Sequence, residues 1–572
     1  MNKRFFLALI LTAIVIVVTP LLFPSAMRNT ASNRLLDSAG KTADTTGSVI
    51  KTPELVASVI APATSAIAPN SSIPQLKQAA TSGDTAVVRT IHARYTFSSR
   101  GGVPTSIVLD SYPSLRPDSR SQRAELVGRH DALVRYRLVL SGDTIALDTI
   151  PLRVERGAEN AKAPTITFAG QVAGHTLQLR YVFATDTADK YLVHVSVVFE
   201  NALPGSSLLI QLPRTMHSNE ADTLDDLNHL AMSYRPTIGD VKSIGFSKLD
   251  SSESVITPGP INWVATRDKY FLTVLRSTKT PFSLLSLHGV PRQGKIAAEI
   301  DGSIALPLAP DGTAAFEIYA GPQNFERLQR LGGDLDQVNP YAGWLHGVVQ
   351  PFATMVMKAL LWMKRTTQLN YGWVLVLFGV IIRLVLWPLN QGAMRTSMKM
   401  QRLQPELQAI QKKYSDDPKR QQEAIMKVYK DHGMSPLSPL MGCLPMLLPM
   451  PVLFALYYVF QNTIEFRGVP FLWLPDISLR DPYYITPLLM GVSMFVMSWI
   501  GMRNSPPNPQ AKMMSYMMPV MLTVLFLNFA SGLNLYYAVQ NIAAIPQQWL
   551  LARERGKPAP ATSGGSLEKV RT

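Results

Sequence analysis

The stretch YGWVLVLFGVIIRLVLWPL at residues 371–389 decides what kind of fold this chain has. It is apolar throughout except for Arg383. An α-helix of this length rises about 28 Å, close to the ~30 Å hydrocarbon thickness of a bilayer. We therefore predict that the stretch crosses a membrane and holds a guanidinium group within it.

Five further apolar runs have the length of a membrane span. Four follow the first stretch and one opens the chain behind two basic residues: Leu440–Phe460, Tyr484–Ile500, Met513–Phe529, Leu533–Leu551 and Phe5–Phe23. We interpret residues 1–24 as an uncleaved anchor, with a cleaved signal peptide as the alternative. Six spans predict an α-helical polytopic membrane protein.

Between the opening run and residue 371 the pattern changes. Residues 25–84 are rich in Ala, Ser, Thr and Pro, which is typical of a flexible tether. From residue 85 onward, apolar and polar side chains alternate in short runs separated by Gly, Pro and Asp, for example at 135–140, 177–183, 191–199 and 270–275. Period two predicts strands, so we expect a β-sandwich domain over residues 85–335 and no clear helix before Phe325.

Residues 341–365 form an apolar run with a polar stripe. Polar side chains recur at every fourth position: His346, Gln350, Thr354 and Lys358. This spacing favours an amphipathic helix lying in the membrane interface. The alternative, a further span, would reverse the orientation of every later span.

The distribution of charge predicts that orientation. The chain has 55 Lys and Arg against 40 Asp and Glu, but residues 24–340 hold 31 basic and 30 acidic residues, leaving 24 and 10 elsewhere. Basic loops lie on the cytoplasmic side of a membrane. We therefore place both termini, the segment 391–436 and the basic tail 552–572 in the cytoplasm, and the β-domain outside. The nearly neutral β-domain does not suggest a nucleic-acid-binding face.

The cytoplasmic segment 391–436 is predicted to be a helical hairpin. Its first helix has an apolar seam at spacings of three and four: Met400, Leu403, Leu407, Ile410 and Tyr414. Asp417 followed by Pro418 is typical of an N-cap and first helical residue. The second helix should end near Asp431. The hairpin either docks partners or merely links two spans.

Arg383 is the first candidate site residue. An arginine in mid-span costs about 2.5–3.5 kcal/mol on insertion scales, so it is seldom left facing lipid. One possibility is that the side chain snorkels to the headgroups. The other is a wet cavity open to the cytoplasm. We favour the cavity because the last span supplies polar partners.

These partners lie in the span 533–551. Asn534, Tyr537, Asn541 and Gln548 recur at spacings of three, four and seven, and Tyr536, Gln540 and Gln547 lie beside them. Such a stripe in a membrane helix faces protein or water. It either holds the bundle together through interhelical hydrogen bonds or lines a hydrophilic groove with Arg383.

Several functions are disfavoured. The predicted spans contain no Asp or Glu, unlike those of ion-coupled transporters. The single cysteine, Cys443, allows no intrachain disulfide, and we find no motif for a hydrolase, a metal or a cofactor. A sugar-modifying β-domain would need His92, His175, His194 or His217 to converge with carboxylates. A small-solute transporter and a membrane scaffold are further alternatives.

Separate motifs over residues 370–552 resemble those of the YidC/Oxa insertases. They are VIIR at 380–383, WPL at 387–389, MQRLQPELQ at 400–408, GCLP at 442–445, MP at 450–451, ALYY at 455–458, DPYY at 481–484 with Pro487, and SGL at 531–533 with Tyr536 and Tyr537. The chain departs from the family at Gly379, where some relatives have a hydroxyl, and at Pro449, which replaces a common glutamine. Residues 435–440 also carry a short insertion.

The resemblance implies a Gram-negative type with a five-helix conserved core in the bacterial inner membrane and a periplasmic β-supersandwich similar to sugar mutarotases. It implies a non-enzymatic insertase that takes nascent membrane-protein clients, alone or beside the Sec translocon. Ribosomes or targeting factors would meet the hairpin and tail. The client groove would comprise Arg383, Asn534, Tyr536, Tyr537, Gln540 and Asn541, without a cofactor or metal.

Overall fold

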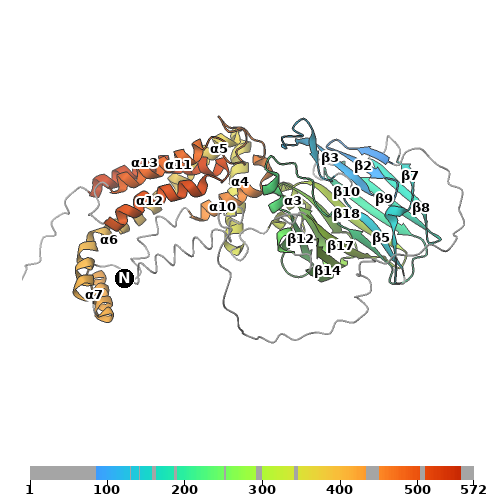
Figure 1. Cartoon of the computed structure of the whole chain (residues 1–572), viewed down its shortest axis with the longest axis horizontal. Helices are drawn as coiled ribbons and strands as arrows, with labels where there is room; N and C mark the ends of the chain where they lie inside the picture. The colour runs from blue at the N-terminus through green and yellow to red at the C-terminus, as the bar shows by residue number, and fades with distance from the viewer. Residues whose placement is uncertain are drawn as a thin grey trace, which may run out of the picture. The chain divides into compact units, whose positions relative to one another are not determined.

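The computed structural model describes residues 85–128, 131–140, 142–157, 163–185, 190–249, 253–290, 299–339, 346–415, 417–432, 450–502 and 509–555. The predicted anchor, the tether, most of the tail and the joint at 435–440 lie outside these residues. The chain divides into a β-domain within residues 27–340 and a helical unit containing residues 341–572, and each is described by itself (Figure 1).

The β-domain contains two antiparallel sheets. The smaller sheet has the order β1-β2-β3-β4: Thr85–Arg89, Ala93–Ser98, Pro104–Pro113 and Arg123–Glu125. The larger sheet has fourteen strands, twelve of them in the order β6-β5-β11-β17-β16-β14-β15-β18-β10-β9-β8-β7, while β12 pairs with β14 and β13 pairs with β12.

The strands of the larger sheet are short except for β14. In chain order they are β5 (Arg135–Leu140), β6 (Asp143–Ala146), β7 (Arg153–Arg156), β8 (Thr165–Val172), β9 (His175–Phe183), β10 (Leu192–Phe199), β11 (Ser207–Gln211), β12 (Ala231–Pro236), β13 (Lys242–Gly245), β14 (Ser254–Arg267), β15 (Phe271–Ser277), β16 (Phe282–Gly289), β17 (Ile300–Pro307) and β18 (Thr313–Pro322). The strands expected at 135–140, 177–183, 191–199 and 270–275 are confirmed. In β10 the alternation of apolar and polar residues matches the alternation of buried and exposed side chains: Val193, Val195 and Val197 are buried.

The larger sheet folds back on itself around the core. Strands β5 and β9 lie far apart in the sheet order, yet the hydroxyls of Tyr136 on β5 and Tyr181 on β9 are 2.8 Å apart. Phe97 of the smaller sheet packs edge-on against the Tyr181 ring. All three rings are fully buried. Since large apolar faces must be covered on folding, this packing accounts for two layers with one aromatic core.

A short helix before Phe325 was not expected. Helix α2 (Thr223–Asn228) begins after Asp222, whose carboxylate accepts the backbone N–H of Asp225. Six residues are too few to display a 3.6-residue period, so the alternation-based expectation was wrong here. Helix α3 (Phe325–Leu331) follows β18 at the expected place. The described part of the domain also contains single-turn 3-10 helices at Leu147–Thr149, Phe246–Lys248 and Leu335–Gln337.

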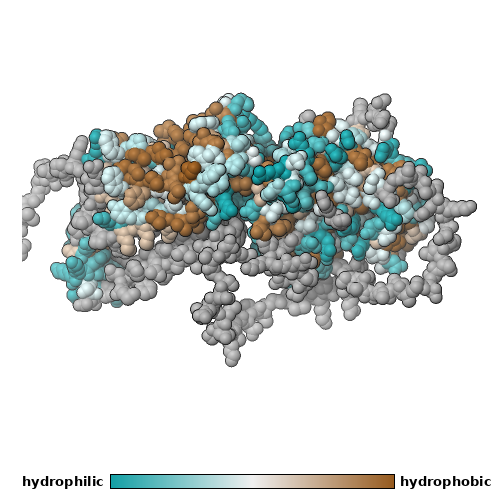
Figure 2. Space-filling model, turned by 45° about the horizontal axis from the view of Figure 1, so that its top comes forward, coloured by the Kyte–Doolittle hydropathy of each residue, from teal (hydrophilic) through white to brown (hydrophobic). Residues whose placement is uncertain are grey.

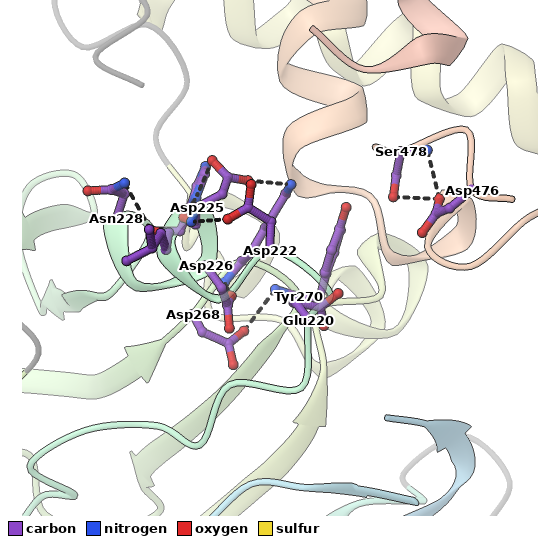
Figure 3. A network of polar contacts seen from close by, with 12 residues as sticks. Glu220, Asp222, Asp225, Asp226, Asn228, Asp268, Tyr270, Asp476 and Ser478 are labelled. Carbon is purple, nitrogen blue, oxygen red and sulfur yellow. Dashed lines mark hydrogen bonds and ion pairs between the residues drawn. The ribbon is translucent and has the colours of Figure 1, made fainter. Parts of the chain in front are cut away.

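Helix α2 is attached to the β14–β15 turn by buried charged groups (Figure 3). The Asp226 carboxylate accepts the backbone N–H of Lys269, whose ammonium lies 2.8 Å from Asp225. One oxygen of Asp268 accepts the N–H groups of Tyr270 and Phe271, and its other oxygen is buried without a hydrogen-bond partner among the described residues. Burial, followed by the neighbouring Asp226 carboxylate, raises the pKa of Asp268 well above its ordinary value.

The helices among the described residues of the helical unit are α4 (His346–Thr367), α5 (Tyr371–Val385), α6 (Trp387–Lys413), α7 (Pro418–Asp431), α10 (Met450–Asn462), α11 (Ile485–Met502), α12 (Pro509–Phe526) and α13 (Ser531–Arg555), with a 3-10 turn at Ile464–Phe466. The predicted span 371–389 was too long, because α5 ends at Val385. Pro388 lies in the first turn of α6 and cannot donate the hydrogen bond that would continue α5.

Only part of the helical unit passes a simple length and hydropathy test for membrane spans. Among the described residues, α11 passes alone, and α4 with α5 passes only as a pair bent by 117°. The helices expose large apolar side chains, including Leu488, Val492, Phe495 and Trp499 on α11. Apolar surface accordingly gathers over the helical unit in Figure 2. Exposed apolar helix faces of this size are expected to be covered by lipid or by protein.

Helices α6 and α7 form the expected hairpin. Their buried contact consists of Leu403, Leu407, Ile425, Val428 and Tyr429, with Ile410 packed against it. The N-cap prediction is confirmed, because the Asp417 carboxylate accepts the N–H groups of residues 419 and 420 at 3.1 Å. Helix α7 ends at Asp431, as predicted.

Candidate polar site in the helical unit

Arg383 lies in the last turn of α5 and is half-buried. Its Nη2 donates to the side-chain oxygen of Gln547 on α13 at 2.6 Å. Its Nε is buried and has no hydrogen-bond partner within the described part of the chain. No described carboxylate forms an ion pair with it. The structure therefore holds an arginine between two helices through one neutral acceptor.

Two further α13 residues face α5 beside this pair. The Gln540 amide donates to the Tyr536 hydroxyl at 2.8 Å and to the Gly379 carbonyl at 3.3 Å. Gly379 lies one turn before Arg383, where its lack of a side chain permits close contact: a Cβ there would lie 3.1 Å from Val539. The backbone carbonyl of Gly379 is thus one polar partner of α5 for the Gln540 amide.

Asn534 and Asn541 face other helices. The Asn534 amide donates to the carbonyl of Phe526 at the end of α12. The Asn541 amide donates to the Ser493 hydroxyl at 3.2 Å and the Met490 carbonyl at 3.5 Å, both on α11. Tyr537 contacts the rings of Phe526 and Tyr536 at centroid distances of 5.6 Å. The two asparagines thus form hydrogen bonds between helices of the bundle, which was the alternative to a hydrophilic groove.

The predicted stripe is therefore two stripes. At about 100° per residue, positions 536, 540 and 547 share one side of the helix, and positions 534, 541 and 548 share another about 120° away. The first side meets α5 and Arg383, whereas the second meets α11 and α12. Gln547 was not among the predicted site residues, although its helical angle relative to Tyr536 and Gln540 was a sufficient signal.

The loop at 463–484, between α10 and α11, fastens one end of α13. The N–H groups of Ser531 and Gly532 donate to the carbonyls of Leu479 and Ile477 at 2.7 and 2.9 Å. Gly532 is required by close packing, because a Cβ would lie 2.5 Å from the Phe460 ring. The loop also contacts the first turn of α5, since the Asn370 amide donates to the Pro470 carbonyl. This loop therefore joins the starts of α5 and α13.

Asp481 shapes the same loop. Its carboxylate accepts the indole N–H of Trp473 and the backbone N–H groups of Tyr483 and Thr486. Burial by itself would raise the pKa of Asp481, but these donors outweigh it and the pKa is lowered. The carboxylate thus stays charged and ties the start of α11 to the loop.

The described histidines and carboxylates do not form a cluster suited to a metal ion. Among the described residues no three His, Cys, Asp or Glu side chains could hold a metal ion. The histidines considered for a sugar-modifying site have different neighbours: His92 lies near Tyr191, His175 near Phe199, and His194 3.0 Å from Glu317.

The chain is similar to known proteins over most of its length. A family model described as the YidC periplasmic domain matches residues 85–355, and one described as a 60 kDa inner membrane protein matches residues 362–557. A relative from Chlorobium limicola is 30% identical over 490 residues, covering 80% of each chain, and one from Chlorobaculum tepidum is 29% identical over 489 residues, covering 79% of each. Both are named as the membrane protein insertase YidC.

A solved structure is also similar. The crystal structure of an active YidC insertase with its first transmembrane domain resolved is 19% identical, with a TM-score of 0.33. The similarity covers 82% of this chain and 93% of that one.

Proposed function

Because this chain belongs to the YidC family of membrane protein insertases, which are not enzymes, we propose that it inserts client proteins through a hydrophilic groove containing Arg383. It is an inner membrane protein with a large β-rich periplasmic domain and a helical C-terminal region. Of the residues predicted for the groove, Arg383, Tyr536 and Gln540 would line it, whereas Asn534 and Asn541 hydrogen-bond to α12 and α11.

The observation that supports this mechanism is that Arg383 is partly buried without a charged partner among the described residues. It is half-buried, has a neutral glutamine as its partner and has no described carboxylate paired with it. A guanidinium has five N–H donors, and Gln547 uses one of them. A cation near low-dielectric walls attracts anions more strongly than one in water. Arg383 would thereby draw an acidic or polar client tail into the bundle from the cytoplasm.

The apolar part of the client provides the driving force. Burying apolar surface is favourable by about 0.8 kcal/mol per CH₂ group, so a span of about twenty apolar residues enters lipid spontaneously once its polar tail has crossed. Helices α10 and α12 would form the apolar path. Helix α12 exposes Met513, Met517, Val520, Met521 and Val524, and methionine surfaces adapt to varied apolar partners.

The remaining parts are assigned on the same proposal. Six spans place both termini, the 391–436 hairpin and the 552–572 tail in the cytoplasm, where ribosomes or targeting factors would dock. Helix α4 would lie flat in the interface, which its 117° bend from α5 supports. The periplasmic domain would be a supersandwich, and the insertase would act alone or beside the Sec translocon.

The test compares Arg383→Ala and Arg383→Lys in proteoliposomes, using two clients that differ only in whether the translocated tail is acidic or neutral. We expect Arg383→Ala to slow insertion of the acidic-tailed client about tenfold or more, and Arg383→Lys to retain most of the rate because the charge remains. Arg480→Ala is the matched control, because Arg480 is an exposed arginine in the 463–484 loop. Wild-type rates in both Arg383 variants would remove the electrostatic role.

A further inference from the structure

Gln547 contacts two elements with opposite ends of one amide. Its oxygen accepts from Arg383 at 2.6 Å, and its nitrogen donates to the carbonyl of Trp387, the first residue of α6, at 3.1 Å. The side chain is 1% exposed. One buried amide on α13 therefore bridges the arginine and the joint between α5 and α6.

The chemistry of the two partners leaves one orientation for this amide. A guanidinium only donates, so the glutamine oxygen must face Arg383, and a carbonyl only accepts, so the nitrogen must face Trp387. If the amide were flipped by 180°, its nitrogen would face the guanidinium donors and its oxygen would face the carbonyl, so neither hydrogen bond could form. The two hydrogen bonds consequently form together, and the Gln547 amide positions both Arg383 and Trp387.

The hydrogen bond from Gln547 to Trp387 reinforces the α5–α6 joint, where the backbone hydrogen bonding is incomplete. Leu386 is both the C-cap of α5 and the N-cap of α6, and Pro388, two residues further on, has no N–H to donate. The joint is thus held by fewer backbone hydrogen bonds than a continuous helix. Beyond it, α6 leads directly into the hairpin with α7.

We propose that Gln547 is a positioning residue: it orients Arg383 without neutralising it, and it couples the arginine to the base of the α6–α7 hairpin. A glutamate at this position could accept from Arg383 equally well but would pair its charge. An apolar residue would leave the charge intact but release both partners. Only a neutral amide orients the guanidinium, retains its positive field and fastens the joint at once.

This inference rests on the proposed function, so its test includes Arg383→Ala. The variants are Gln547→Glu, which adds a charge at nearly constant shape, and Gln547→Met, which removes the hydrogen bonds at similar volume. Gln548→Met is the control, because Gln548 is a buried neighbour on the other side of α13. Full-length proteins are reconstituted, and the insertion rates of the acidic-tailed and neutral-tailed clients are measured.

We expect Gln547→Glu to slow the acidic-tailed client about tenfold while leaving the neutral-tailed client near the wild-type rate. Gln547→Met should slow the acidic-tailed client by a smaller factor, and Gln548→Met should not distinguish the two clients. Equal slowing of both clients by the Gln547 variants would mean a purely structural role and would overturn the proposal. Selective slowing by Arg383→Ala with no selective effect at Gln547 would overturn it while leaving the groove mechanism intact.

Hydrogen exchange tests the coupling to the hairpin independently of transport. In the full-length protein, Gln547→Met should speed amide exchange in the first turns of α6 several-fold relative to Gln548→Met. Unchanged exchange in that segment would refute the link between Arg383 and the hairpin, even if the variants folded normally and remained active.

Discussion

Replacing Gly372 by alanine tests the packing that joins α5 to the 463–484 loop. Gly372 lies in the first turn of α5, in direct contact with the Phe471 ring. A Cβ there would lie 2.0 Å from Cδ2 and 2.2 Å from Cγ of the Phe471 ring. Phe471 is buried and packs edge-on against Trp373, so its ring is held from two sides.

The structure allows an estimate of the cost. Overpacking a tight contact costs about 1–3 kcal/mol, and the upper end applies because Cγ lies on the χ2 axis, so turning the ring about χ2 does not relieve the contact. Alanine regains at most about 1 kcal/mol of helix propensity over glycine. We therefore expect Gly372→Ala to lower the free energy of unfolding of the helical unit by about 2 kcal/mol.

Gly392→Ala is the matched control, because a Cβ at this helical glycine of α6 would meet nothing within 4 Å. It should stabilise the protein by about 0.5–1 kcal/mol. Unfolding of the full-length protein in mixed micelles, followed by helical circular dichroism, measures the difference between the two variants. If Gly372→Ala proved as stable as Gly392→Ala, the Phe471 ring would be free to move and the described attachment of the loop would be wrong.

Two further predictions concern charged groups. The raised pKa of Asp268 means that the folded β-domain retains a proton that the unfolded chain releases above about pH 4, so this group's contribution to stability falls as pH rises toward the folded-state pKa. Asp268→Asn, which is always neutral, should reduce the loss of stability that thermal unfolding measures as the pH rises above about 4; an unchanged pH dependence would contradict the assignment. Asp417→Ala removes both N-cap hydrogen bonds of α7 and should cost the hairpin about 1 kcal/mol, seen as faster amide exchange in α7, while equal exchange would show that the cap contributes nothing.

Local patterns predicted much of the fold. The strands of the β-domain follow from alternation because one side of each strand meets a buried core, as in β10. The hairpin followed from the spacing of Leu403 and Leu407, together with the Asp417 cap. Helix α2 was not predicted because six residues are too few to show a helical period. The predicted end of α5 was too late because the apolar run continues through the backbone break before Pro388.

The sequence by itself determined which segments are apolar enough for a bilayer, where the charges lie, and that Arg383 needs a polar partner. These properties belong to the chain and hold in any arrangement of the helices. Only the tertiary structure decided that the partner is Gln547 and that Asn534 and Asn541 bind α11 and α12 instead. The physical reason is that the rotation of α13 about its axis is set by packing, such as the close approach of Val539 to Gly379, and a rotation turns every polar side chain toward a different neighbour.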